Sequence, residues 1–108
     1  MRELADSQFR LVPGHLGAGT VAVRSVNFPD RYVRAGDGVL RIEPFEDTDD
    51  YGRATSFVRV PGLADRSAVS LRSSTDTRAY LAHDTGRLVL ARPGGGRAER
   101  ERATFRFR

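Results

Sequence analysis

The chain repeats itself with a period of 48 residues. Three phenylalanines mark the period, since Phe9, Phe57 and Phe105 are evenly spaced (57 − 9 and 105 − 57). Most of the sequence between them matches at the same offset without a gap, as when Pro13-Gly14 returns as Pro61-Gly62. A fixed period of this size indicates one supersecondary unit that is used repeatedly and buries its apolar face against its neighbours.

Within each period, apolar and polar residues alternate in short runs that end in turn residues, which is typical of β-strands. The pattern predicts a single all-β domain over 1–108. Residues 10–57 and 58–105 form its two complete units, 1–9 are the tail of a preceding unit, and 106–108 end the chain. The expected strands are 21–26, 31–34, 39–42, 56–60, 69–73, 79–82, 87–91 and 103–107. Apolar residues never recur at helical spacing beyond one turn, so polar loops are expected between these strands.

Four strands per repeat of this length fit either a propeller blade or one lobe of a β-trefoil. Short strands with a Pro-Gly crossing between units favour the trefoil, here two complete lobes plus the last strand of a third. Three lobes would need 144 residues (3 × 48), against 108 in this chain. We therefore expect either a longer reading frame with a missing N-terminal segment or self-association that closes the barrel, because open strand edges favour association.

Composition excludes several classes of function. All 18 cations are arginine, which indicates a GC-rich genome rather than selection for an anion-binding surface. The net charge of +4 is spread along the chain and does not by itself predict a nucleic-acid partner. The absence of cysteine excludes disulfides and thiolate metal sites. No apolar run predicts a membrane span or a signal peptide. His15 and His83 are too far apart to predict a zinc site, and neither a cofactor nor a glycosidase pair of carboxylates is indicated.

Two segments carry a family resemblance, 24–34 (RSVNFPDRYVR) and 54–65 (ATSFVRVPGLAD). Together they resemble the arabinofuranose-binding domain of α-L-arabinofuranosidases, carbohydrate-binding module family 42, and the similarity spans nearly the whole chain. The resemblance implies a β-trefoil without catalytic activity, which binds polysaccharides decorated with arabinofuranose, such as arabinan or arabinoxylan. It also implies a secreted protein, whose catalytic unit, if it has one, lies outside this chain.

The resemblance also implies which residues hold the sugar. In that family each competent lobe uses a histidine after the tyrosine strand and an aspartate 19 residues later. Those positions are Ala35 and Ala54 in the first unit, and His83 and Arg102 in the second. Asp6 keeps the aspartate of the preceding lobe. No lobe has a complete pair, so the resemblance implies weakened or lost sugar sites.

The remaining candidate residues have two interpretations each. His83 with Asp84 either orients a sugar hydroxyl or is a polar pair leading into a turn. Tyr32 and Tyr80 either lay their rings against a sugar or belong to the core. His15 is expected in a surface loop.

Residues 43–50 hold five acidic side chains and are expected to form a solvated loop. The alternative function is a structural or protein-interaction trefoil that has lost sugar binding. A third interpretation, an α-L-arabinofuranosidase, is disfavoured relative to the second by the incomplete His/Asp pairs.

Overall fold

The computed structural model describes residues 2–3, 9–17, 19–36, 38–84 and 87–106. The elements of these residues are, in chain order, β1 (Arg2–Glu3), β2 (Phe9–Pro13), β3 (Val21–Ser25), β4 (Arg31–Gly36), β5 (Val39–Pro44), α1 (Asp49–Thr55), β6 (Phe57–Pro61), β7 (Val69–Ser73), β8 (Tyr80–Asp84), β9 (Arg87–Ala91), α2 (Arg97–Arg102) and β10 (Phe105–Arg106). The prediction of a domain built on a β-sheet is confirmed, and the seven expected strands between 21 and 91 agree with β3–β9 to within two residues at each end. Strand β2 lies outside the expected strands and crosses the expected unit boundary after residue 9, and of the expected strand 103–107 the structure has Phe105–Arg106 as β10.

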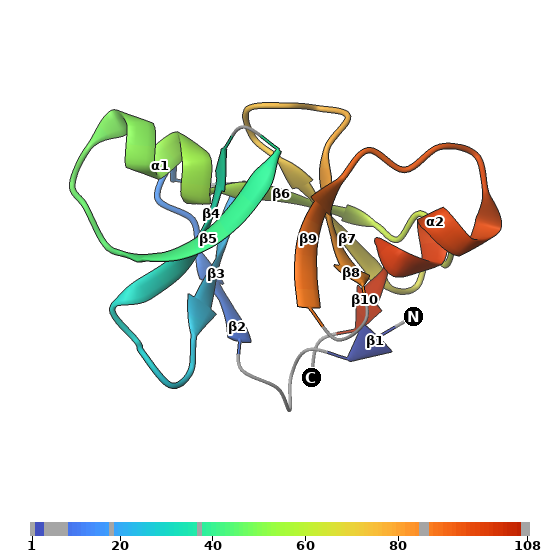
Figure 1. Cartoon of the computed structure of the whole chain (residues 1–108), viewed down its shortest axis with the longest axis horizontal. Coiled ribbons are helices and arrows are strands. Elements are labelled where there is room, and N and C mark those ends of the chain that lie inside the picture. Colours follow the sequence, from blue (N-terminus) through green and yellow to red (C-terminus); the bar gives the residue numbers. More distant parts are fainter. Residues whose placement is uncertain (1, 4–8, 18, 37, 85–86, 107–108) are drawn as a thin grey trace.

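The strands form one sheet that is antiparallel except for the pairing of β1 with β10. The sheet curls into a barrel-like shape that is nearly closed (Figure 1). Its strands follow the order β1-β10-β7-β6-β3-β4-β5, with β2 paired to β3, and β8 joining β7 to β9. The two helices lie toward opposite ends of the molecule (Figure 1).

The strand pairing repeats with the same period as the sequence. Strands β6 and β7 pair in the same register as β2 and β3, shifted by one period. The crossing pair Val21–Phe57 returns as Val69–Phe105. Strand β6 pairs with β7 along its whole length while its first residue pairs with β3, so it connects the two units.

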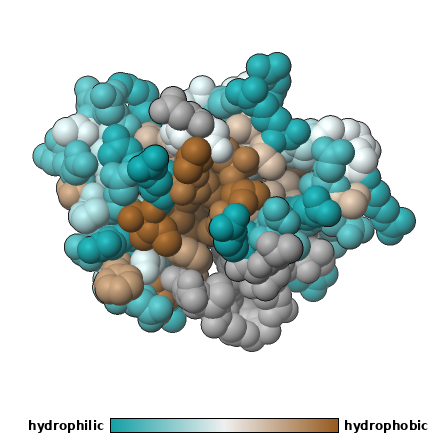
Figure 2. Space-filling view, in the orientation of Figure 1, coloured by the Kyte–Doolittle hydropathy of each residue, from teal (hydrophilic) through white to brown (hydrophobic). Residues whose placement is uncertain are grey.

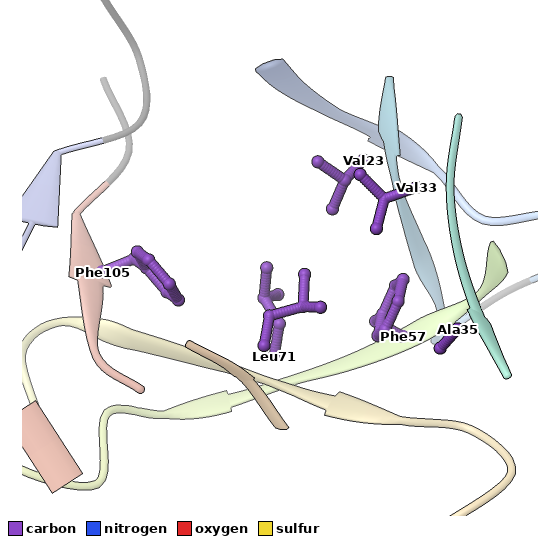
Figure 3. Packing of buried hydrophobic residues seen from close by; sticks show 7 residues of the cluster. Val23, Val33, Ala35, Phe57, Leu71 and Phe105 are labelled. Carbon is purple, nitrogen blue, oxygen red and sulfur yellow. The ribbon is translucent and has the colours of Figure 1, made fainter. Parts of the chain in front are cut away.

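The repeated phenylalanines belong to the hydrophobic core. Phe57 and Phe105 are fully buried, and Leu71 lies between them (Figure 3). Phe9 is half-buried and packs against the same cluster. Burying an aromatic side chain contributes more stability than burying most others, because it removes a large apolar area from water. The sequence period therefore reflects a packing requirement of the sheet.

Two short helices, α1 and α2, occupy segments that were expected to be loops, so this expectation is wrong there. The Thr48 hydroxyl caps α1 by accepting a hydrogen bond from the Tyr51 amide at 3.1 Å. Asp49 and Asp50 lie in its first turn, where they favour the helix electrostatically. The buried Tyr51 side chain fixes the helix to β5 by donating a hydrogen bond to the Glu43 carbonyl at 2.9 Å.

The Pro-Gly of each unit opens the same turn. The Gly14 amide donates to the Thr20 carbonyl, and the Gly62 amide donates to the Ala68 carbonyl, both at 3.0 Å. A β-carbon at Gly62 would collide with the carbonyl oxygen of Asp65. Glycine is required at this turn because the backbone passes too close for any side chain.

Candidate functional site

A pocket of about 570 Å³ is lined by residues of the β4–β5 hairpin and of α1 in the first unit. These two elements are drawn in Figure 1. The walls of the pocket consist of Arg34, Ala35, Gly36, Val39, Arg41 and Glu43 from β4 and β5, Asp50, Arg53 and Ala54 from α1, and Thr75. Ala35 and Ala54 thus line the same cavity. These are the two positions at which the family resemblance places the sugar-binding pair, so the fold brings the two positions together.

Ion pairs organise the charged wall of the pocket. The Nη1 atom of Arg34 lies 3.4 Å from Glu43 Oε2 and 3.6 Å from Glu46 Oε1. The Nη2 atom of Arg53 lies 2.6 Å from Asp50 Oδ1. Such partly exposed pairs contribute little to stability, but they fix the direction of the side chains. Glu43 was expected in a solvated loop, and this expectation is wrong, because it is half-buried in β5.

Arg41 differs from the other two arginines of the pocket. Its side chain is exposed at the pocket rim, and it forms no ion pair with any residue that the structure describes. A guanidinium group offers five N–H donors in a planar fork and has no acceptor. Arg41 is therefore a cation in the pocket wall whose donors are available to a ligand.

Beside the pocket, His15 is enclosed by aromatic rings. Its ring centroid lies 4.6 Å from that of Tyr32 in an edge-on arrangement, 5.3 Å from that of Phe45 and 5.8 Å from that of Tyr51. Burial lowers the pKa of His15, because a buried ring is less able to carry charge. The expectation that His15 lies in a surface loop is wrong in this respect: its turn is predicted, but its ring is half-buried.

The hydrogen bonds of this cluster define the tautomer of His15. Its Nδ1 atom lies 2.8 Å from Thr55 Oγ1. The Thr55 hydroxyl donates its own proton to the Tyr51 carbonyl at 2.7 Å. Because a hydroxyl has only one proton, Nδ1 of His15 must carry the hydrogen of the bond to Thr55. The cluster therefore ties the turn after β2 to the last residue of α1.

Tyr51 connects the aromatic cluster to the charged wall. Burial, followed by the charges around it, raises the pKa of Tyr51 to about 12. The Arg34 guanidinium lies 5.3 Å from the centroid of the Tyr51 ring, within cation–π range. The hydroxyl therefore stays protonated at any physiological pH and acts as a donor.

In the second unit, three candidate residues lie on β8. His83 is half-buried with its ring 6.0 Å from that of Phe105, Asp84 is exposed at the strand end, and Tyr80 is half-buried opposite Arg72. Side chains alternate along a strand, so Tyr80 and His83 point to opposite faces of β8. The strand does not bring all three side chains to one surface, and their role in binding stays a prediction.

The partner position of His83 lies on α2. Arg102 is the exposed last residue of this helix, and α2 contacts β8. His83 and Arg102 are the repeat equivalents of Ala35 and Ala54, which line one pocket. Asp6 lies outside the described residues.

A metal-binding cluster and a membrane-spanning helix are both absent from the described part of the chain. It holds no group of three histidine, aspartate or glutamate side chains that could bind a metal ion. None of its helices is long and apolar enough to cross a membrane.

Fold and pocket together define an all-β domain that is built from a repeated unit and has a polar pocket in its first unit. The chain belongs to the α-L-arabinofuranosidase B (ABFB) domain family, whose model matches residues 3–59 and again 48–108. Each match spans about one period of the repeat. The family resemblance inferred from the two sequence segments is confirmed.

Known arabinofuranosidases resemble the chain in sequence and in structure. α-L-Arabinofuranosidase B of Pyricularia oryzae is 36% identical over 63 residues, which are 56% of this chain and 13% of that protein. A GH54 α-L-arabinofuranosidase soaked with a cyclic sulfate inhibitor superposes with a TM-score of 0.71 at 24% identity, over 81% of this chain and 19% of that one. An arabinofuranosidase complexed with arabinofuranosyl-α-1,2-xylobiose superposes with a TM-score of 0.72 at 23% identity, over 93% of this chain and 21% of that one. The chain thus corresponds to one small domain of much longer proteins.

Proposed function

We propose that the chain is a non-catalytic carbohydrate-binding module of a secreted protein, which recognises polysaccharides decorated with arabinofuranose. The observation that carries the proposal is that the fold brings the two positions of the family's sugar-binding pair to one pocket, as Ala35 and Ala54 do in the first unit. The second unit keeps the histidine of this pair as His83. Membership of the arabinofuranosidase B domain family supports it. So does the arabinofuranosyl-xylobiose bound to a solved protein of the same fold.

The charged groups of the pocket support binding rather than catalysis. Glycoside hydrolysis requires two carboxyl groups on opposite sides of the scissile bond, one of them protonated. The two carboxylates that line this pocket, Glu43 and Asp50, are each ion-paired with an arginine. Both carboxylates are therefore engaged in orienting arginine side chains, which favours a role in binding.

We assign the architecture as an incomplete β-trefoil. The equal register of β2–β3 and β6–β7 and the repeated crossing pairs support two equivalent lobes. Strand β2 corresponds by one period to β6, the strand that ends the first lobe. In this arrangement each lobe places its ligand positions between a hairpin and the helix that follows it.

Binding at the second unit is the first test. With His83 in place and Arg102 at the aspartate position, we expect affinity in the millimolar range or weaker for arabinofuranosyl oligosaccharides. His83→Ala should abolish chemical-shift changes in an NMR titration. Arg102→Asp should strengthen binding by about 1.5–3 kcal/mol, the size of a hydrogen bond to a charged group. Arg100→Asp is the matched control, since it makes the same charge change on α2 and should leave affinity unchanged.

Two results would contradict this assignment of the second site. One is micromolar binding with shifts centred on residues 31–36 instead of His83. The other is an Arg102→Asp variant that binds no better than Arg100→Asp, which would mean that the lobe has changed beyond the two positions.

An apolar patch favours a second candidate function, protein interaction. Apolar side chains gather at the centre of one face, between β5 and β9 (Figure 2). Val39 and Ile42 of β5 are among the exposed large hydrophobic residues. Exposed patches of this kind are typical of interaction surfaces. If sugars of every class leave the NMR spectrum unchanged, this function takes precedence.

A further inference from the structure

We propose that the pocket of the first unit binds a sugar that carries a carboxylate group, a uronic acid, in place of neutral arabinofuranose. The inference rests on the proposed function, that this domain binds the sugars of a polysaccharide. It concerns what the first unit selects, and it follows from the groups that line the pocket.

The pocket lacks the two polar groups that would hold a neutral furanose. A neutral furanose with vicinal hydroxyls is well held by a carboxylate that accepts two of their hydrogen bonds. Ala35 and Ala54 contribute only methyl groups to this pocket, at the two positions where an imidazole and a carboxylate would be needed. The space remains, since about 570 Å³ lies within the usual range for a ligand pocket.

The pocket offers guanidinium groups to a ligand. Three guanidinium groups, from Arg34, Arg41 and Arg53, line it against two carboxylates. Glu43 and Glu46 lie next to Arg34, and Asp50 lies next to Arg53. Arg41 is left without a carboxylate among the described residues. A ligand carboxylate could pair directly with the Arg41 guanidinium through two parallel hydrogen bonds, which a neutral sugar cannot do.

Other groups in the pocket would hold the hydroxyls and the ring of such a sugar. Each carboxylate in the wall uses one oxygen in its ion pair, Oε2 of Glu43 and Oδ1 of Asp50. The other oxygen of each can accept a hydrogen bond from a ring hydroxyl. Val39 and the two alanines supply apolar surface for the C–H groups of the ring. A uronic acid has all three kinds of group: a carboxylate, hydroxyls and an apolar ring face.

The positions of the arginines differ between the two units. The repeat equivalents of Arg34, Arg41 and Arg53 are Ala82, Val89 and Glu101. The second unit instead carries arginines at the positions of Val39 and Ala54, as Arg87 and Arg102. The two units therefore place their cations differently around the equivalent site, as expected if they hold different ligands.

The test is an NMR titration of the full chain with glucuronic acid and galacturonic acid oligosaccharides, and separately with neutral arabinofuranosyl oligosaccharides. Uronic acid oligosaccharides should shift the signals of Arg41, Ala35 and Ala54, with affinity that falls as salt is raised. Arg41→Gln should weaken this binding at least tenfold. Arg87→Gln, which removes an exposed arginine of β9 outside the pocket, should weaken it less than twofold.

The outcomes separate this inference from the proposed function. Arabinofuranosyl binding without uronic acid binding would overturn the inference and leave the module intact as a sugar binder. Equal losses in Arg41→Gln and Arg87→Gln would show general attraction to a basic surface and would also overturn it. Failure of both ligand classes would overturn both proposals. Circular dichroism of each variant confirms that a loss of binding is not a loss of fold.

Discussion

His15 donates a hydrogen bond from Nδ1 to Oγ1 of Thr55 over 2.8 Å, although the two residues are 40 positions apart in the sequence. This bond fastens the end of α1 to the turn that follows β2. Because α1 carries Asp50, Arg53 and Ala54 into the pocket, the position of the pocket wall depends on this contact. The stability of the first unit and the position of its pocket wall are therefore linked through His15.

Removing the acceptor of this bond should destabilise the protein. Thr55→Val keeps the shape of the buried side chain but leaves the Nδ1–H of His15 without its partner. A buried donor without an acceptor costs about 1–3 kcal/mol. Urea denaturation measures the loss, and Thr77→Val on an exposed turn is the control, with an expected change within about 0.5 kcal/mol. Equal effects of the two substitutions would contradict the role of the bond.

Stability should depend on pH through His15. Burial lowers its pKa in the folded state, while the unfolded chain keeps the ordinary value of 6.5. Between these two values the unfolded state binds more protons, so the free energy of unfolding rises with pH. The contribution is complete above pH 6.5 and is lost as the pH falls through the folded value.

The measurement compares urea denaturation of the protein and of His15→Gln at pH 7 and pH 5. The difference in free energy of unfolding between the two proteins should shrink at the lower pH. Any contribution of His83 cancels, because both proteins contain it. The pKa values of Asp65 and Asp76 are lowered from 3.8, chiefly by hydrogen bonds, so both carboxylates stay ionised in this window. A constant difference would show that His15 has the same pKa in both states.

The repeated phenylalanine should be essential to the core. Phe57→Ala removes a fully buried ring, and such truncations cost about 3–5 kcal/mol through lost burial and the cavity left behind. Phe28→Ala is the control, because the Phe28 side chain is 56% exposed, with the Arg31 guanidinium 5.3 Å from the centroid of its ring. Its loss should stay below about 1 kcal/mol. Thermal unfolding followed by circular dichroism would rank the two, and a reversed order would be incompatible with the core described above.

Glycine at the Pro-Gly turn should resist substitution. Gly62→Ala forces a methyl group against the carbonyl oxygen of Asp65, so the backbone of the turn must move. We expect a loss of more than about 1 kcal/mol, the range of backbone strain. Gly95→Ala, where a β-carbon would meet no atom within 4 Å, should be neutral or slightly stabilising. The comparison fails if both variants unfold at the same urea concentration.

The chain should self-associate at micromolar concentration. Strand β2 pairs only with β3 among the described strands, which leaves its other edge without hydrogen-bond partners. Such an edge is a template for pairing with a second chain. Light scattering or sedimentation velocity measures the mass in solution. A cooperative, well-folded monomer would show that the edge is protected in another way.

Much of the fold was predictable because the information is local or periodic. Alternation of apolar and polar residues places β3, β7 and β9, and the offset between Phe57 and Phe105 carries the prediction from one unit to the other. Helix α1 was missed because it is too short to show a periodic apolar face. Its one visible signal is Thr48 before Asp49 and Asp50, the residues of a helix start.

The site was predictable only in part. The family pattern located Ala35 and Ala54, and the fold brings them to one pocket. The enclosure of His15 was not predictable, because its ring contacts come from Tyr32, Phe45 and Tyr51, which only the folded chain brings near it. The arginines of the pocket wall were not recognised either, since a charged residue on a strand has the same sequence pattern whether it faces a cavity or bulk water.

Strand β6 joins the two units more closely than the 48-residue period of the sequence suggests. Along its length it pairs with β7 of the following unit, while Phe57 at its start pairs with Val21 of the preceding one. A cut after Phe57 would separate this residue from Ser73 of β7, and a cut before it would separate it from Val21 of β3. Neither unit carries its own complete set of neighbours. To move the domain into another protein, both units would have to be transferred together.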